Sequence, residues 1–214
     1  MASAIPGTRK AIARLSDDAV RAKVRDYLLA SAEVKRQAAG ACLDSIVAAA
    51  RAVAESLRQG GKVLICGNGG SAADSQHLAA EFVSQLDKRC VRAAMAAIAL
   101  TTDTSILTAI SNDLGYSHVF ERQIEALARA GDALLGISTS GNSENIACAL
   151  QLARRKHIKT IALTGADGGK LKDLADVAIR VPSCDVQQIQ EVHLAIEHLL
   201  VLLTEEELFG REEG

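Results

Sequence analysis

The chain has 214 residues, enough for a domain with a sizeable core. Apolar residues make up 49% of it and charged residues 23%, which is the balance of a globular protein and argues against disorder. A net charge of −2 and an aromatic content of 2%, with no tryptophan, argue against nucleic acid or an anionic membrane surface as a partner.

The cysteines and the N-terminus both indicate a cytoplasmic protein. The cysteines are odd in number and form no CxxC pairs, so we expect reduced thiols, mostly buried. Residues 1–16 lack the apolar stretch of a signal peptide, and no run of about 18 apolar residues predicts a membrane span. The five cysteines are Cys42, Cys66, Cys90, Cys148 and Cys184.

Two helices are expected before the first strand. Ser16, followed by two aspartates, is a good helix start, and apolar residues then recur at helical spacing through Val34. A second, alanine-rich helix is expected from about Cys42 to Leu57, where a pair of glycines follows it. We predict that residues 16–59 form a helical hairpin, which either mediates oligomerisation or packs on its own sheet.

From residue 62 onward, strand-like and helix-like segments alternate. The strands are short continuous apolar runs, as expected when helices cover both faces of a parallel sheet. This pattern predicts an α/β fold: a doubly wound, Rossmann-like, five-stranded parallel sheet flanked by helices, in one domain of residues 1–214 with its core over 62–208. The expected strands are 62–66, 95–100, 132–137, 159–164 and 177–181, and the expected helices lie near 72–88, 103–111, 117–130, 143–157 and 187–208.

Two turns rich in glycine and serine each follow an expected strand, one over residues 67–71 and the other over 138–143. A strand that ends in such a turn and opens a helix directs unpaired N–H groups and the positive end of the helix dipole at one spot. That spot suits a phosphate, so we expect a phosphorylated small molecule to bind there. The candidate contacts are Asn68, Gly69, Gly70, Ser71, Ser138, Thr139, Ser140 and Ser143.

Other phosphate sites fit the turns less well. Residues 67–72 match the dinucleotide fingerprint G-x-G-x-x-A, but a dinucleotide site also needs an acidic residue about 20 residues on, at the end of the next strand. The nearest candidate there, Asp103, lies about thirty residues on, past a long helix. A third glycine-rich turn, over 164–169, does not have the spacing of a Walker A loop. The remaining alternative is that these turns are only tight connections.

At these residues the chain resembles sugar isomerase (SIS) domains, and within them it is similar to the phosphoheptose isomerases, which are sedoheptulose 7-phosphate isomerases. The resemblance covers about residues 20–208. Its narrower motifs are Gln76-His77-x-x-x-Glu81 and Gln190-Glu191-x-His193-x-x-x-x-His198. By position, the resemblance implies that the active-site residues are His77, Glu81, Gln190 and His198.

A ketose–aldose conversion needs a base to move a proton between C1 and C2 and a partner for the oxygens. We assign Glu81 as the base and His198 as the partner, although the two roles could be reversed. A metal ion would stabilise the negative charge of the enediolate, and the resemblance allows one zinc ion per subunit. The candidate ligands are His77, Glu81, Gln190 and His198.

The spacing within the last helix constrains this ligand set. Gln190 and His198 are eight residues apart, which is about 12 Å along an ideal helix. Either they come from different subunits, or one of them contacts substrate. The resemblance implies a homotetramer with active sites shared between subunits, which agrees with the first possibility.

Several of these residues also have structural interpretations. A His-x-x-x-Glu pair on a helix is often an exposed ion pair, and His198 could be a buried core histidine. Asp103 is either a substrate contact or the N-cap of the helix that follows it. His193 is expected to be structural. Gln187 stands where related isomerases often carry an aspartate, so the exact substrate is open.

The predicted function is conversion of sedoheptulose 7-phosphate to D-glycero-D-manno-heptose 7-phosphate, the first step toward heptose for lipopolysaccharide. The alternative is a non-catalytic SIS scaffold that binds the bacterial replication initiator. The resemblance implies that such a scaffold lacks the glutamate and the second histidine. Because this chain has both Glu81 and His198, catalysis is favoured.

Overall fold

A five-stranded, all-parallel sheet forms the centre of the molecule, as the alternating pattern predicts. The structure, a computed structural model, describes residues 15–87 and 91–210, so Cys90 lies outside the described part. The strands stand in the order β2-β1-β3-β4-β5. Their bounds are β1 Val63–Gly67, β2 Ala97–Ala99, β3 Ala133–Ser138, β4 Lys159–Thr164 and β5 Val177–Arg180.

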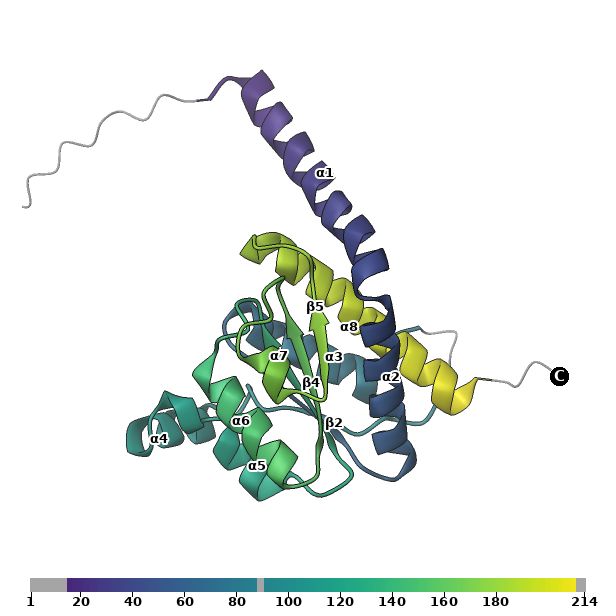
Figure 1. The fold of residues 1–214 in the computed structure, drawn as a ribbon, viewed down its shortest axis with the longest axis vertical. Helices are drawn as coiled ribbons and strands as arrows, with labels where there is room; N and C mark the ends of the chain where they lie inside the picture. The colour runs from purple at the N-terminus through teal and green to yellow at the C-terminus, as the bar shows by residue number, and fades with distance from the viewer. Residues whose placement is uncertain (1–14, 88–90, 211–214) are drawn as a thin grey trace, which may run out of the picture.

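Helices cover both faces of the sheet, because its inner strands bury alternate side chains on opposite sides. In β1, Val63 and Ile65 join one hydrophobic cluster while Leu64 and Cys66 join the other. The first cluster packs under α2, α3 and α8, and the second under α5, α6 and α7 (Figure 1). These helices are α2 Leu43–Arg58, α3 Gly70–Val83, α5 Glu121–Leu127, α6 Glu144–Arg155, α7 Leu171–Leu174 and α8 Val186–Phe209.

Three elements differ from the expectation. The helix predicted over 117–130 is broken into a 3₁₀ turn, Tyr116–His118, and α5; the buried residues Val119 and Phe120 lie at the break. Apolar spacing continues across this break, so the pattern cannot detect it. The short helix α7 was not expected, and β2, an edge strand, is shorter than predicted. The helix α4, Thr104–Asp113, agrees closely with the predicted one.

The N-terminal helices exist, but the prediction that they fold into a hairpin is wrong. Helix α1, Asp17–Ala41, is separated from α2 by the single residue Cys42, which keeps a right-handed helical conformation. The N–H of Cys42 donates to Ala38 and its carbonyl accepts from Ile46, so helical bonding continues through the junction. The two helices therefore run nearly end to end, and α1 projects from the body of the molecule (Figure 1). A hairpin would need a loop of two to five residues.

The expectation that the cysteines are mostly buried holds for two of the four that the structure describes. The cysteines it describes are all free; Cys42 and Cys66 are buried, Cys148 is half-buried and Cys184 is exposed. Burial raises the pKa of the Cys66 thiol to about 12. Among the described residues, no helix is long and apolar enough to cross a membrane.

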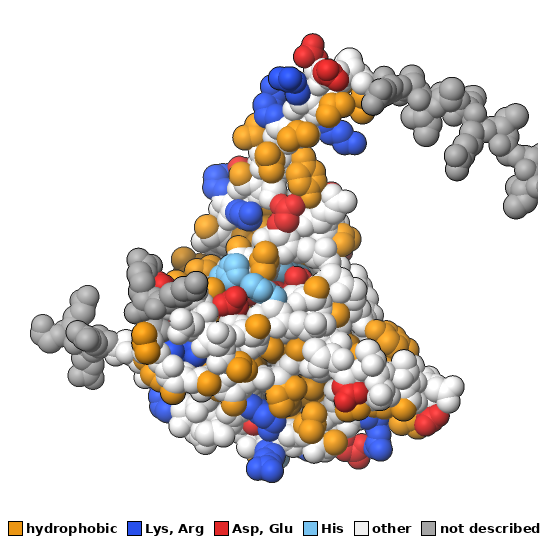
Figure 2. All heavy atoms as spheres, turned by 180° about the vertical axis from the view of Figure 1, so that it is seen from behind, with side chains coloured by type: hydrophobic (Ala, Val, Ile, Leu, Met, Phe, Trp, Pro, Cys, Tyr) orange, Lys and Arg blue, Asp and Glu red, His pale blue; other side chains and the backbone are white. Residues whose placement is uncertain are grey.

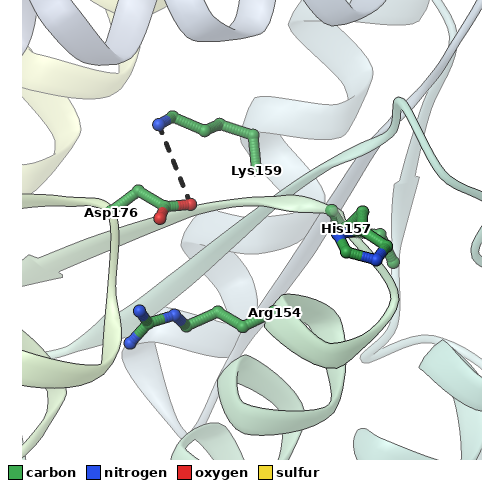
Figure 3. A pocket seen from close by; sticks show the side chains of 5 residues that line it. Arg154, His157, Lys159 and Asp176 are labelled. Atoms are coloured by element: carbon green, nitrogen blue, oxygen red, sulfur yellow. Dashed lines mark ion pairs between the residues drawn. The ribbon is translucent and has the colours of Figure 1, made fainter.

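Helix α6 ends in a turn at the amino edge of the sheet, away from the glycine-rich turns. His157 has a φ of 56°. Among the residues that the structure describes, it is the one non-glycine residue with a positive φ. Its N–H donates to Arg154 and that of Ile158 donates to Ala153, the bonding pattern of a Schellman motif. Figure 3 shows His157 with Arg154, Lys159 and Asp176 around a pocket at this edge.

Replacing His157 by glycine should stabilise the protein. A side chain in the left-handed region costs roughly 1 kcal/mol, which glycine avoids. We expect the melting temperature of His157→Gly to rise by roughly 2–4 °C. Lys156→Gly is the matched control, because Lys156 has a φ of −92° and gains nothing from glycine. Equal effects in both variants would contradict this explanation.

Candidate active site

The two glycine- and serine-rich turns meet at the carboxyl edge of the sheet. β1 and β3 are neighbours, and Gly67 pairs in register with Ile137. The chain leaves β1 toward β2 on one side and returns to β3 on the other, so this is the point where the strand order reverses. Ligands of open α/β sheets bind in the crevice outside such a point.

The first turn depends on glycine at two positions. Gly69 has a φ of 58°, which favours glycine. Gly70, the first residue of α3, lies against the last helix: a Cβ there would come 2.5 Å from Nε2 of Gln190. The turn thus brings the start of α3, with its unpaired N–H groups, close to the Gln190 amide.

The second turn gathers hydroxyl groups at the start of α6. The Ser138 and Ser143 hydroxyls lie 2.8 Å apart. Ser143 is the N-cap residue of α6, yet its side chain makes no capping bond to the helix. Thr139 is half-buried, and Ser140 is exposed and accepts a hydrogen bond from the N–H of Asn142. The helix start and its hydroxyls are therefore available to an anion.

Asn145 and Tyr116, which the sequence did not single out, both contact Asn68 in the first turn. The side-chain amides of Asn68 and Asn145 bond reciprocally, at 3.0 and 2.9 Å. The Tyr116 hydroxyl donates to Oδ1 of Asn68 at 2.9 Å. Asn145 is buried and lies two residues beyond the second turn, so motif spacing alone gives little signal for it. Of the predicted substrate contacts, Asn68 is thus held mainly by the protein itself.

The third glycine-rich turn supports the second one. The N–H of Gly165 donates to Thr139 and that of Leu171 donates to Gly141. A Cβ on Gly141 would lie 2.1 Å from the Gly168 carbonyl oxygen, and Gly141 has a φ of 65°. Close backbone contact of this kind requires glycine. The third turn therefore holds the backbone of the second turn in place.

Helices α3 and α8 lie side by side and run in the same direction. Gly70 contacts Gln190 at one end, and Nε2 of His77 lies 2.9 Å from Nε2 of His198 further along. These contacts are seven residues apart on α3 and eight on α8, about 10 and 12 Å of helix rise. The matched spacing places the two histidines together and leaves Gln190 at the first turn.

Glu81 completes this cluster. Its Oε1 lies 3.8 Å from Nε2 of His77, one helical turn before it. The side chains of His77 and Glu81 are 40% and 21% exposed, so a solute can reach them. Figure 2 shows histidine and acidic side chains together on one face, at the foot of the projecting α1. The structure thus brings together three of the four predicted active-site residues.

The buried core histidine of α8 is His193. It is fully buried, and its Nε2 lies 3.1 Å from the carbonyl oxygen of Thr164. Burial lowers the pKa of His193 to about 4, so the ring is neutral at pH 7. The structural interpretation therefore applies to His193, whereas His198 is only half-buried and faces His77.

Two carboxyl groups behind the histidines were not anticipated. Glu197 is fully buried, and burial, followed by the nearby charge of Asp74, raises its pKa to about 8. Burial also raises the pKa of Asp74, while His77 opposes that shift. Glu197 is therefore mostly neutral at pH 7 and adds little charge beside His198.

Asp103 has the structural role that the sequence allowed. Its Oδ1 accepts a hydrogen bond of 2.9 Å from the N–H of Ile106, so Asp103 is the N-cap of α4. Asp185 caps α8 in the same way, through Gln187 and Gln188. Gln187 itself is exposed at the start of α8.

The imidazole and carboxylate groups of His77, His198 and Glu81 are ligand types that suit zinc, but the three side chains do not surround one point. Two imidazole nitrogens 2.9 Å apart are close to the separation of two ligands on one ion, since Zn–N bonds are about 2.0–2.1 Å. Across residues 15–87 and 91–210, no three His, Cys, Asp or Glu side chains already have the spacing of a metal site. Glu81 would have to turn inward. Gln190, at Gly70, does not reach the cluster within one chain.

Comparison with known proteins agrees with this site. The SIS domain family model matches residues 26–165. A phosphoheptose isomerase of Roseiflexus sp. is 52% identical over 186 residues, covering 87% of this chain and 93% of that protein. This chain belongs to the phosphoheptose isomerase family.

Solved structures give the same result. Phosphoheptose isomerase from Neisseria gonorrhoeae is 43% identical, with a TM-score of 0.82 over 87% of this chain and 99% of the other. The enzyme from Francisella tularensis is 38% identical, with a TM-score of 0.83 over 87% of this chain and 98% of the other. The SIS fold of this family is therefore the fold of this chain.

Proposed function

We propose that this protein isomerises sedoheptulose 7-phosphate to D-glycero-D-manno-heptose 7-phosphate. The observation that carries the proposal is the contact of His77 with His198, with Glu81 beside them, on a helix that opens at a phosphate-type turn. This arrangement holds a proton acceptor and a proton donor within reach of one small molecule whose phosphate is fixed elsewhere. Family membership supports the same substrate class.

The phosphate group would bind at the starts of α3 and α6. Backbone N–H groups and the Ser138 and Ser143 hydroxyls are the donors there. Gln190, which lies against Gly70, is near the same turn and is suited to hold a sugar hydroxyl. The sugar would then extend from the phosphate along α3 and α8 toward the histidines.

The chemistry has two steps, each with a pair of proton transfers. Glu81 takes the proton from C1 of the ketose while His198 donates a proton to the C2 oxygen, which gives the enediol. Glu81 then returns a proton to C2, and His198 takes the proton from the C1 oxygen as the aldehyde forms. The two roles can be exchanged without changing the balance of protons, and no oxidant or reductant is needed.

We further propose one zinc ion per subunit, held by His77, Glu81 and His198. A bound zinc ion would stabilise negative charge on the sugar oxygens. Gln190 was expected as the fourth ligand. Because it lies eight positions before His198 on the same helix, it would complete the set only from a second copy of the chain.

The scaffold alternative is not favoured. It would require the phosphosugar site without the acid–base groups, whereas Glu81 and His198 both lie at the site. Relatives that are about half identical to this chain, over most of its length, are named phosphoheptose isomerases.

We also propose that the protein is a homotetramer with active sites at subunit interfaces. The first half of α1, residues 17–30, contributes no buried residue, yet it carries an apolar stripe of Val20, Val24 and Leu28. An isolated helix arm of this length is marginal in water without a partner. The arm joins α8 next to the site, because the Tyr27 hydroxyl donates to Glu191 at 2.6 Å.

We place the protein in the cytoplasm, where unpaired thiols persist and where phosphorylated sugars are made. There it would supply the first step of heptose precursor biosynthesis for lipopolysaccharide. Cell fractionation tests this placement, and recovery from the periplasm would contradict it.

The function is tested by turnover of sedoheptulose 7-phosphate. We expect turnover by the parent protein and at least a roughly hundredfold loss of kcat in Glu81→Gln and in His198→Ala, because each removes a proton-transfer group. His157→Asn, at the opposite edge of the sheet, is the control and should keep its activity. No turnover by the parent, with phosphosugar binding intact, would favour the scaffold.

The metal proposal is tested by zinc content after dialysis. We expect about one zinc per chain in the parent and a loss of most of it in His77→Ala, since that variant removes one of three ligands. His118→Ala, which changes a histidine bonded to Glu121 outside the cluster, should keep its zinc. Equal zinc in all three proteins would contradict the assignment.

The assembly is tested by sedimentation of a variant in the arm. Val24→Asp puts a charge in the apolar stripe, so we expect the tetramer to dissociate at micromolar concentration. Asp26→Lys, about 200° around the helix from Val24, is the control and should remain tetrameric. A parent protein that sediments as a monomer would overturn the proposal.

A further inference from the structure

A buried arginine joins the end of α3 to α8. The Arg92 side chain is fully buried, and its Nε donates to Oε1 of Glu205 at 2.6 Å. Glu205 is itself only 3% exposed and lies on α8, two helical turns after His198. Buried charges of this kind persist in proteins only when they are paired and hydrogen-bonded.

The other end of the guanidinium binds carbonyl groups of α3. Its Nη2 donates to the Glu81 carbonyl at 2.9 Å, and its Nη1 donates to the Phe82 carbonyl at 3.0 Å. The last carbonyls of a helix have no partner within the helix, and a cation at that end also interacts favourably with the helix dipole. Arg92 therefore satisfies the final turn of α3, where Glu81 lies.

We propose that Arg92 is a positioning residue for the acid–base pair. It fixes the backbone of Glu81 and, through Glu205, holds that turn at a set distance from the helix that carries His198. Arg92 reaches no reacting atom itself. The inference rests on the proposed isomerase function.

The planar shape of the side chain is essential to this role. Arginine offers five N–H donors in a fixed fork, and here the fork serves a carboxylate and two helix carbonyls at once. Lysine keeps the charge but has one flexible ammonium group, which cannot reproduce the same directions. A small displacement of Glu81 is enough to slow the reaction, because misplacement by about 1 Å can cost roughly a hundredfold in rate.

The proposed phosphate site, at the starts of α3 and α6, lies at the end of α3 opposite to Arg92. Substrate binding should therefore be largely independent of Arg92. We expect kcat of Arg92→Lys to fall by roughly 10- to 100-fold while KM stays within about threefold. Glu205→Gln keeps an acceptor for Nε, so its loss of kcat should be smaller and KM should again be unchanged. If Arg92→Lys does not fold, kcat and KM of Glu205→Gln still test the proposal.

Lys62→Met is the matched control for the loss of a buried ion pair. Nζ of Lys62 lies 2.6 Å from Oδ2 of Asp132, and this pair lies at the amino edge of the sheet, away from α3 and α8. We expect Lys62→Met to lower the melting temperature with kcat within about twofold of the parent. If Arg92→Lys or Glu205→Gln likewise lowers only the melting temperature, or raises KM and not kcat, the proposal is wrong.

A second measurement does not require turnover. In protein labelled with ¹⁵N-histidine, the ring signals of His77 and His198 should shift in Arg92→Lys and stay in place in Lys62→Met. If the parent has no isomerase activity but these signals shift, the proposed function fails while Arg92 still positions the two helices. Unchanged signals in Arg92→Lys would overturn the positioning role itself.

Discussion

The site depends on the parallel packing of α3 and α8. These helices lie far apart in the sequence, and each carries only part of the machinery. Because their contacts are seven and eight residues apart, the start of α3 meets Gln190 while His77 meets His198 at 2.9 Å. One helix pair therefore fixes both the contact at the first turn and the contact between the histidines. Beyond the histidines, Arg92 bonds to Glu205 on α8 and to the Glu81 carbonyl on α3, so it joins the two helices there as well.

The parallel sheet supplies the second constraint. Its reversal between β1 and β3 puts two helix starts side by side, and the amide pair of Asn68 and Asn145 ties them together. In the proposed function, the length of α3 would keep a phosphate bound there away from the acid–base groups. Backbone dipoles would then bind the anion, and side chains further along the helix would move protons.

Sequence patterns predicted most of this arrangement. The five strands, their parallel order and the position of the two glycine-rich turns at the strand ends follow from short apolar runs and turn residues, and the structure confirms them. That these turns bind phosphate stays a prediction. The hairpin was wrong because composition cannot distinguish a reversal from a helix that continues through Cys42. Asn145, Glu197 and Arg92 were missed because their roles come from tertiary contacts, which leave no local pattern.

In the proposed complex, the phosphate sits at the two helix starts while the reacting carbons lie between Glu81 and His198. A crystal structure of the Glu81→Gln variant with sedoheptulose 7-phosphate bound tests it most directly. We expect phosphate oxygens in hydrogen-bond contact with Ser138 and Ser143. We also expect C1 and C2 within about 3.5 Å of His198 and of the substituted amide side chain on α3. A sugar bound with its reacting carbons away from both side chains, or a phosphate bound at the amino edge of the sheet, would contradict it.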